Sequence, residues 1–148
     1  MIKVRNLEPD DKDEVYQHLV LLSQHTESES HFVLTKNNFK KELEKDWYGI
    51  VAIDDNIIVG SCLYCFANIN RAFKESQILF LDSLFVKKGH RKQKVATKLI
   101  EELVKIAKER NINRIQLWCL KSNIEGVSFY KQVAERQNDL FDIYDIRV

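Results

Sequence analysis

Apolar and polar positions along the chain divide it into short runs that predict alternating strands and helices. The longest apolar run, Ile78 to Val86, is bounded by polar segments and predicts a strand buried on both faces. Further along, apolar residues recur at spacings of four, four and three residues, at Val95, Leu99, Leu103 and Ile106, which is typical of one face of a helix. The basic segment Lys87 to Lys94 lies between them. This stretch therefore predicts a strand, a basic turn and the N-terminus of a helix.

The same patterns extend the prediction over the whole chain. Ile2 to Arg5 alternates as an edge or second strand does, and the runs on either side of Asp54-Asp55-Asn56 predict a hairpin. Pro9 and Thr35 stand where helices begin. The expected elements are a strand at 2–5, helices from Pro9 to near Ser23 and from Thr35, strands at 47–53, 57–66 and 78–86, a helix from Val95, a strand at 114–120, a helix carrying Phe129 and Tyr130, and a strand at 140–147.

Composition adds limits to this α/β pattern. With 148 residues, no repeats and four glycines and one proline, the chain is expected to form one domain over residues 1–148. A net charge of +1 gives no global field, so nucleic acid and anionic membrane are not expected partners, and the basic turn lacks interleaved aromatic residues. The apolar runs have strand length, so no membrane span is expected, and a cytoplasmic location is the default expectation.

Three cysteines offer little chemistry. Cys62 and Cys65 have the spacing of a redox or zinc pair, but residues three apart on a strand point to opposite faces, and no second Cys or His pair lies nearby. With Cys119 they are expected to be free thiols that act as small buried hydrophobes. A zinc site from His25 and His31 is less favoured still, so we expect no metal.

The basic turn is the first candidate site. The first N–H groups of a helix lack partners within it and carry partial positive charge, so they suit a phosphate. His90, Arg91, Lys92 and Lys94 add charge around these groups. The turn therefore predicts an anionic, phosphorylated ligand, and the alternative is an ordinary solvated turn.

The residues of this turn also carry a resemblance. Arg91-Lys92-Gln93-Lys94-Val95-Ala96 resembles the pyrophosphate-binding turn of the GCN5-related N-acetyltransferases (GNAT), Arg/Gln-x-x-Gly-x-Gly/Ala. Lys94 stands where that pattern has its first glycine. The lysine either weakens the binding of pyrophosphate by the turn, or keeps a helical φ and adds a cation. Asn123 and Phe129-Tyr130 have the spacing of a second family pattern, and FLDSLFV is somewhat similar to the diamine acetyltransferases. The resemblance implies a single-domain fold with a mixed, largely antiparallel sheet flanked by helices.

The resemblance also implies a cofactor and the residues that bind it. Acetyl-CoA would lie with its pyrophosphate on the turn and its pantetheine arm along the central strand, where that strand separates from its neighbour. The implied contacts are Leu84, Phe85, Val86, Arg91, Lys92, Gln93, Lys94, Val95, Ala96, Asn123 and Tyr130. A backbone N–H of residues 84–86 is also a candidate to polarise the thioester carbonyl.

Two residues are candidates for proton transfer. Tyr130 resembles the family tyrosine that protonates the coenzyme thiolate, and a phenol is protonated at neutral pH; the alternative is a packing pair with Phe129. Asp82 stands where relatives carry an acidic residue, and a carboxylate within an apolar run is costly to bury without a purpose or a partner. Glu75, or water, is the alternative base.

The expected activity is acetyl transfer to a primary amine by direct attack. Glu27, Glu29 and Asp82 favour a small cationic acceptor, although Glu27 and Glu29 also fit a solvated acidic loop. An amino sugar, an amino acid, a peptide N-terminus or a lysine side chain stays open as the acceptor. The alternative function is a catalytically degenerate acyl-CoA-binding or regulatory module. Relatives often pair, so a homodimer is also possible.

Overall fold

The structure of the chain is a computed structural model. The structure describes residues 1–43, 45–69, 71–72, 74, 76–134 and 144–148. Backbone contacts divide the chain into two compact units, Met1–Trp118 and Cys119–Val148, and each is described by itself. The first unit contains the sheet and most of the expected elements, including the basic turn.

The described part of the first unit is built on a five-stranded sheet in the order β1-β2-β3-β4-β5. Its strands are β1 (Lys3–Asn6), β2 (Tyr48–Asp54), β3 (Ile57–Asn68), β4 (Gln77–Val86) and β5 (Ile115–Leu117). The first four pair antiparallel, and β4 pairs parallel with β5. The mixed, largely antiparallel sheet predicted from the sequence is therefore confirmed, with β1 at its edge.

The hairpin between β2 and β3 follows from its turn residues. Asp55 and Asn56 have φ of 47° and 63°, the left-handed region in which Asn and Asp are the best-tolerated side-chain residues. A two-residue loop with both φ values positive matches the twist of the flanking strands. The strands then pair from Asp54 with Ile57 to Tyr48 with Tyr64. The predicted hairpin is confirmed.

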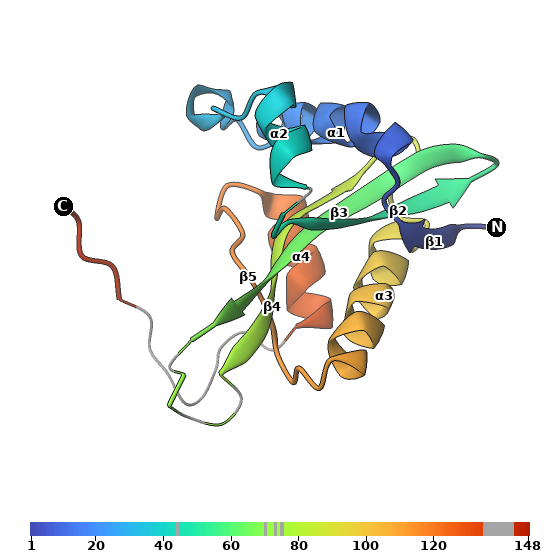
Figure 1. The fold of residues 1–148 in the computed structure, drawn as a ribbon. Helices are drawn as coiled ribbons and strands as arrows, with labels where there is room; N and C mark the ends of the chain where they lie inside the picture. Colours follow the sequence, from blue (N-terminus) through green and yellow to red (C-terminus); the bar gives the residue numbers. More distant parts are fainter. Residues whose placement is uncertain (44, 70, 73, 75, 135–143) are drawn as a thin grey trace. The chain divides into compact units, whose positions relative to one another are not determined.

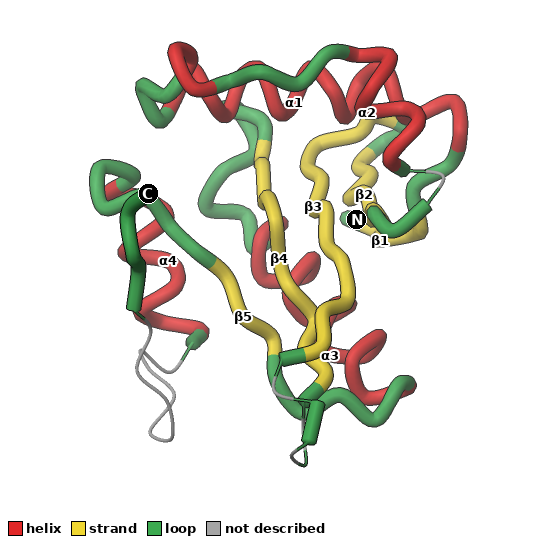
Figure 2. The backbone as a smooth tube through the Cα atoms, turned by 60° about the vertical axis from the view of Figure 1, so that its left-hand side comes forward, coloured by secondary structure: helices red, strands yellow, loops and turns green. Residues whose placement is uncertain are grey.

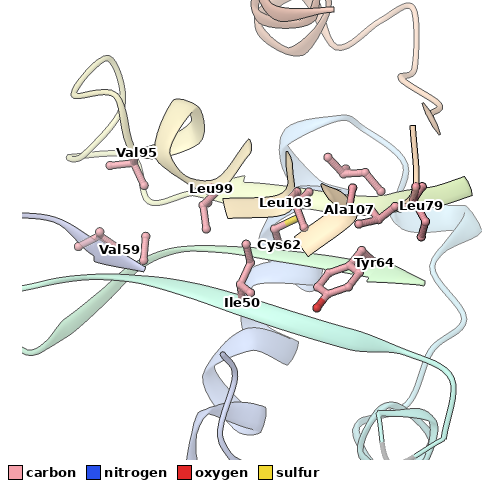
Figure 3. Close-up of a cluster of buried hydrophobic side chains, with 12 residues drawn as sticks. Ile50, Val59, Cys62, Tyr64, Leu79, Val95, Leu99, Leu103 and Ala107 are labelled. Carbon is pink, nitrogen blue, oxygen red and sulfur yellow. The ribbon is translucent and has the colours of Figure 1, made fainter. Parts of the chain in front are cut away.

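Helices of the first unit cover both faces of the sheet (Figure 1). Helices α1 (Lys12–His25) and α2 (Lys36–Glu42) pack over one face, where Val15 and Phe39 are fully buried. Thr35 caps α2 as predicted, with Oγ1 accepting from the N–H of Asn38. Helix α3 (Val95–Glu109) covers the other face, and Figure 3 shows Val95, Leu99, Leu103 and Ala107 along the strands. The predicted apolar face of α3 is thus the central core contact.

Some predicted boundaries differ from the structure. Helix α1 runs two residues beyond the predicted end at Ser23, and β5 has three residues where a strand at 114–120 was predicted. In the second unit, α4 (Ile124–Val133) contains Phe129 and Tyr130 as predicted. Of the predicted strand at 140–147, residues 140–143 lie outside the described residues, and the described remainder, 144–147, is not in a strand.

Candidate functional site

The turn between β4 and α3 is folded back on the end of β4. The N–H of Lys87 donates to the carbonyl of Val59 at 2.8 Å, and the N–H of His90 donates to the carbonyl of Lys87 at 2.9 Å. The guanidinium Nε of Arg91 donates to the carbonyl of Val86 at 3.2 Å. Arg91 is half-buried by this contact. Its side chain is therefore positioned at the end of β4, in the turn that leads to α3.

Two lysines of the turn adopt a backbone conformation that glycine usually supplies. Lys92 has φ of 61° and Lys94 has φ of 64°. The interpretation that Lys94 keeps a helical φ is therefore wrong, because the residue lies in the left-handed region as the N-cap of α3. Left-handed backbone costs a side-chain-bearing residue about 1–2 kcal/mol. The turn thus keeps the backbone shape of a glycine at this position and adds a cation.

The first turn of α3 leaves its amides available. The first hydrogen bond of the helix runs from the N–H of Lys98 to the carbonyl of Lys94, at 3.0 Å. The N–H groups of residues 95–97 come before it and have no acceptor within the helix. No side chain caps the N-terminus, and the first turn contains no acidic residue. Together with the exposed Lys92, Gln93 and Lys94, these groups are the candidate site for the predicted anion.

Strand β4 separates from β5 after a short paired segment. The two pair only from Leu79 with Ile115 to Leu81 with Leu117, and Figure 2 shows them diverging beyond that point. Residues 82–86 therefore have no β5 partner within the described sheet. Leu84 and Val86 are half-buried against the α3 core, while Phe85 is buried. This unpaired part of β4 contains residues 84–86, the segment predicted to bind the pantetheine arm.

Asp82 occupies an irregularity of β4. Leu63 pairs with Ser83 and Tyr64 pairs with Leu81, so Asp82 is the extra residue of a β-bulge. The prediction of a strand buried on both faces is wrong here, because Asp82 is exposed and the bulge turns it out of the apolar run. Its carboxyl nevertheless lies against the protein, and this desolvation raises its pKa. A raised pKa makes the carboxylate a better proton acceptor.

Trp47 is a neighbour of Asp82 that the sequence analysis did not identify. Its indole N–H partly opposes the rise in the pKa of Asp82. The contact falls short of the geometry of a direct hydrogen bond, and Nε1 is otherwise buried without a partner. Trp47 directly precedes β2. The last pair of the hairpin is Tyr48 with Tyr64, so extending the register by one residue sets Trp47 opposite Cys65. Cys65 pairs with Phe80, so the contact of Trp47 with Asp82 depends on the bulge in β4, which the sequence pattern does not show.

A second carboxylate acts on the same region. Burial is the main cause of the raised pKa of Cys65, and the charges of Asp82 and then Asp46 raise it further. Cys65 itself pairs with Phe80 in the register between β3 and β4. Asp46 and Asp82 thus place negative potential around one half-buried thiol. Negative potential at this point favours a cationic group.

A buried histidine supports the strand that leads into the turn. His18 of α1 is 1% exposed, its Nδ1 lies 2.7 Å from Oγ of Ser61, and its ring packs on Phe85 with centroids 4.6 Å apart. Burial is the main cause that lowers its pKa to about 4. Glu14 lies 3.9 Å from its Nε2 and forms an ion pair with Lys87 at 2.5 Å. These contacts tie α1 to the start of the basic turn.

The other predicted acceptor residues lie in the connection after α1. Glu27 and Glu29 are both exposed, and Glu27 has φ of 55° directly after the helix. Glu29 begins the short 3₁₀ helix η2 (Glu29–His31). Their exposure fits the solvated loop as well as an acceptor site. Glu75, the alternative base, lies outside the described residues.

Asn123 and Tyr130 lie in the second unit. Oδ1 of Asn123 accepts a hydrogen bond from the N–H of Gly126 at 3.1 Å and so caps α4. Tyr130 is half-buried, and its ring contacts that of Phe129 with centroids 5.3 Å apart. Each residue therefore has a local structural role in α4. Their part in binding a coenzyme stays a prediction.

The remaining chemistry of the first unit is limited. Cys62 is fully buried, as predicted, whereas Cys65 and the second unit's Cys119 are only half-buried; all three are free. In the part of the chain that the structure describes, no three His, Cys, Asp or Glu residues are grouped to hold a metal ion. Within the same residues, no helix has the length and apolar character to cross a membrane.

A family model identifies the class of protein. The acetyltransferase (GNAT) family model matches residues 10–134, which include β2 to β5 and α1 to α4. The chain therefore belongs to the GNAT acetyltransferase family. Curated proteins give no match to this chain.

Solved structures agree with this fold. A ribosomal-protein-alanine N-acetyltransferase from Brucella melitensis biovar Abortus is 19% identical, with a TM-score of 0.80 over 99% of both chains. An aminoglycoside acetyltransferase from a soil metagenomic sample, in complex with sisomicin, is 19% identical with a TM-score of 0.74, over 99% of this chain and 97% of its own. An aminoglycoside N-acetyltransferase in complex with CoA is 13% identical with a TM-score of 0.75, over 100% and 96%. At these identities the likeness shows the fold.

Proposed function

We propose that this chain transfers an acetyl group from acetyl-CoA to a primary amine by direct attack. The observation that carries the proposal is the turn of Lys87 to Ala96, which combines uncapped helix amides with cations and a glycine-like backbone at Lys94. Membership of the acetyltransferase family supports the same reaction. Acetyl-CoA, when bound, supplies the acetyl group as a thioester.

The residues of the turn fit the anionic part of this coenzyme. The amides of residues 93–96 and the guanidinium of Arg91 would bind pyrophosphate, with Lys92 and Lys94 adding charge. The backbone of Leu84 to Val86 would bind the pantetheine arm, because that edge of β4 has no β5 partner in the described sheet. No metal is needed for either contact.

Two side chains of the chain would move protons. The carboxylate of Asp82 would accept a proton from the amine, and its raised pKa favours this role over that of an ordinary surface carboxylate. The hydroxyl of Tyr130 would donate a proton to the departing sulfur, a role carried over from the family pattern Asn123 to Tyr130. Asn123 would help to bind the coenzyme from the same segment.

A small cationic amine is the acceptor class that we favour. Asp82 and Asp46 both place negative charge near Cys65, and a protonated amine is drawn to such a region before it loses its proton. Glu27 and Glu29 would add to this potential from the connection after α1. Solved structures of similar fold include acetyltransferases for aminoglycosides and for a ribosomal protein alanine, so both cationic small molecules and peptide N-termini belong in the screen.

Calorimetric titration with acetyl-CoA and with CoA tests the binding step. Micromolar binding that Arg91→Ala weakens about tenfold or more would support the turn as the coenzyme site, because a charge-assisted hydrogen bond contributes about 1.5–3 kcal/mol. Lys105→Ala is the matched control, since it removes a cation from the exposed side of α3 outside the first turn. Equal loss in both variants, or no binding to the wild type, would contradict the proposal.

The chemical step needs its own measurement. Release of free CoA thiol is followed with a panel of diamines, amino sugars and amino-terminal peptides. Tyr130→Phe and Asp82→Asn are each expected to lower kcat about a hundredfold while coenzyme affinity changes little, because general acid–base catalysis contributes about 10²–10⁴-fold. Coenzyme binding without turnover of any amine would favour the degenerate acyl-CoA-binding module instead.

A further inference from the structure

A cavity of about 520 Å³ lies at the sheet edge where β1 ends. Strand β1 stops at Asn6, opposite Ile50, and the last backbone link on that side runs from the N–H of Leu7 to the carbonyl of Gly49 at 2.9 Å. Beyond this link, β2 continues to Tyr48 without β1. The end of α3 lines one side of the cavity and the segment between α2 and β2 lines another. None of the lining residues belongs to the stretch from Leu84 to Ala96.

Aromatic rings form one wall of this cavity. The rings of Tyr48 and Tyr64 stack with centroids 5.6 Å apart, and Phe66 contacts Tyr48 at 5.4 Å and Tyr64 at 5.8 Å. Figure 3 shows the ring of Tyr64 at the end of the core cluster where Ala107 and Leu79 lie. Tyr48 is 39% exposed, and Trp47 also lines the cavity. A flat apolar ring can therefore stack on this wall.

The charged side chains among the described lining residues of the cavity have one sign. Its described lining residues include Lys12 and Arg110 and no carboxylate. The guanidinium carbon of Arg110 lies 4.0 Å from the centroid of Phe66. None of the ion pairs found among the described residues includes Arg110. An arginine that is stacked on a ring, with its N–H groups not engaged by a carboxylate, is well placed to bind a carboxylate.

We propose that this cavity is a second ligand site, which binds a small planar aromatic carboxylate. The ring stacks against Tyr48, and the carboxylate pairs with the guanidinium of Arg110. The volume suits a ligand of this size, since small-molecule sites span about 300–1,000 Å³. This proposal does not depend on coenzyme binding, because the cavity and the basic turn share no lining residue.

Benzoate, with benzamide and acetate as matched probes, tests the site. Binding is read from the indole N–H resonance of Trp47 in a proton–nitrogen correlation spectrum, assigned with Trp118→Phe. Benzoate should shift this resonance saturably. Benzamide, which lacks the charge, and acetate, which lacks the ring, should bind about tenfold more weakly or worse, since an ionic hydrogen bond contributes about 1.5–3 kcal/mol.

Variants decide whether Arg110 is the anchor. Arg110→Gln should reduce benzoate affinity about tenfold, to the level of benzamide, whereas Lys108→Gln removes a nearby cation that does not line the cavity and should leave affinity unchanged. No saturable shift with benzoate would overturn the proposal, as would equal affinity in Arg110→Gln or equal binding of acetate. Titration of the same samples with CoA tests the coenzyme site separately.

Discussion

Helices α3 and α4 both follow a strand and a turn, yet they differ in how the N–H groups of the first turn are capped. At α4, Asn123 caps the N–H of Gly126 with its own side chain, and Glu125 adds an acid to the first turn. At α3, the N-cap Lys94 makes no side-chain hydrogen bond, and the first turn has no acid. One helix satisfies its amides internally, whereas the other presents them with surrounding cations.

This difference separates structural helix ends from binding ones. A side-chain cap stabilises a helix by about 1 kcal/mol, so its absence at α3 is a cost unless a ligand supplies the acceptor. Lys94 adds the cost of a left-handed backbone. The turn lacks a side-chain cap, has a left-handed residue at Lys94 and contains several cations, and these features support the proposal of an anion site there.

The largest expected effect is a loss of folding stability at low pH. The strand before α3 packs on His18, which titrates, whereas the Asn123 cap of α4 does not titrate. Burial lowers the pKa of His18 from 6.5 to about 4, so between these values the unfolded chain binds the proton more readily. Stability from neutral His18 is full above about pH 6.5 and falls as pH drops toward 4, by about 3 kcal/mol in total.

Urea unfolding near pH 7 and near pH 4 measures this loss. In His18→Gln the amide keeps a hydrogen-bonding partner for Ser61 but cannot titrate in this range. The variant should therefore lose about 3 kcal/mol less than the wild type between the two pH values. Glu14 and Lys87, which face the ring, stay the same in both proteins. Equal losses would show that His18 does not carry the acid sensitivity.

The next prediction compares the starts of α3 and α4 through alanine substitutions of one glycine near each. A Cβ on Gly60 would come within 2.9 Å of the Phe85 carbonyl oxygen and of Val95 Cγ1, so the backbone of β4 or the start of α3 must move. The three atoms nearest to a Cβ on Gly126 would all belong to the side chain of Asn123, the first at 2.5 Å, and this side chain can rotate away. Gly60→Ala should cost about 2 kcal/mol of unfolding free energy.

Gly126→Ala serves as the matched variant. Loss of the Asn123 cap costs about 1 kcal/mol, and alanine in place of glycine within a helix returns about the same amount, so the net change should be near zero. Thermal and urea unfolding of both variants check the difference. A loss in Gly126→Ala as large as that in Gly60→Ala would mean that the two helix starts are packed alike.

The sequence predicted the fold well because long apolar patterns determine it. The period of Val95, Leu99 and Leu103 located α3, and the polar break at Asp55-Asn56 located the hairpin. The sequence predicted the length of β5 poorly, since only three residues of that strand pair with β4. Strand length depends on where the neighbouring strand diverges, and a single run of apolar residues does not contain that information.

The candidate site was predicted in part, for a related reason. Arg91 and the helix amides follow from local sequence, because they stand in one short turn; in the structure Arg91 bonds to the carbonyl of Val86 and α3 begins at Val95. The exposure of Asp82 and its contact with Trp47 depend on a β-bulge, which shifts register by one residue and is invisible in the apolar pattern. His18 was missed because it stands at a polar position of α1 and is buried only through tertiary packing.

Converting the first turn of α3 to the α4 type should abolish the anion site. Ala96→Asp adds a carboxylate to the first turn, where α4 already has Glu125. The helix should gain about 0.5 kcal/mol from its dipole, while CoA affinity falls about tenfold or more through repulsion and competition for the amides. Ala96→Asn controls for size. Unchanged CoA affinity in the aspartate variant would place the coenzyme elsewhere.

The smallest expected effect has opposite signs at the two N-caps. Lys94→Gly removes the strain of a side-chain-bearing residue in the left-handed region, about 1–2 kcal/mol. The entropy cost of glycine opposes this gain by about 0.5–1 kcal/mol. The free energy of unfolding should therefore rise by about 0.5 kcal/mol. Asn123→Gly has no such strain to relieve, because φ is −80°, and should lose a few tenths of a kcal/mol with the cap. Urea unfolding of both variants measures the two signs, and a loss in Lys94→Gly would mean that the lysine itself stabilises the turn enough to outweigh its strained backbone.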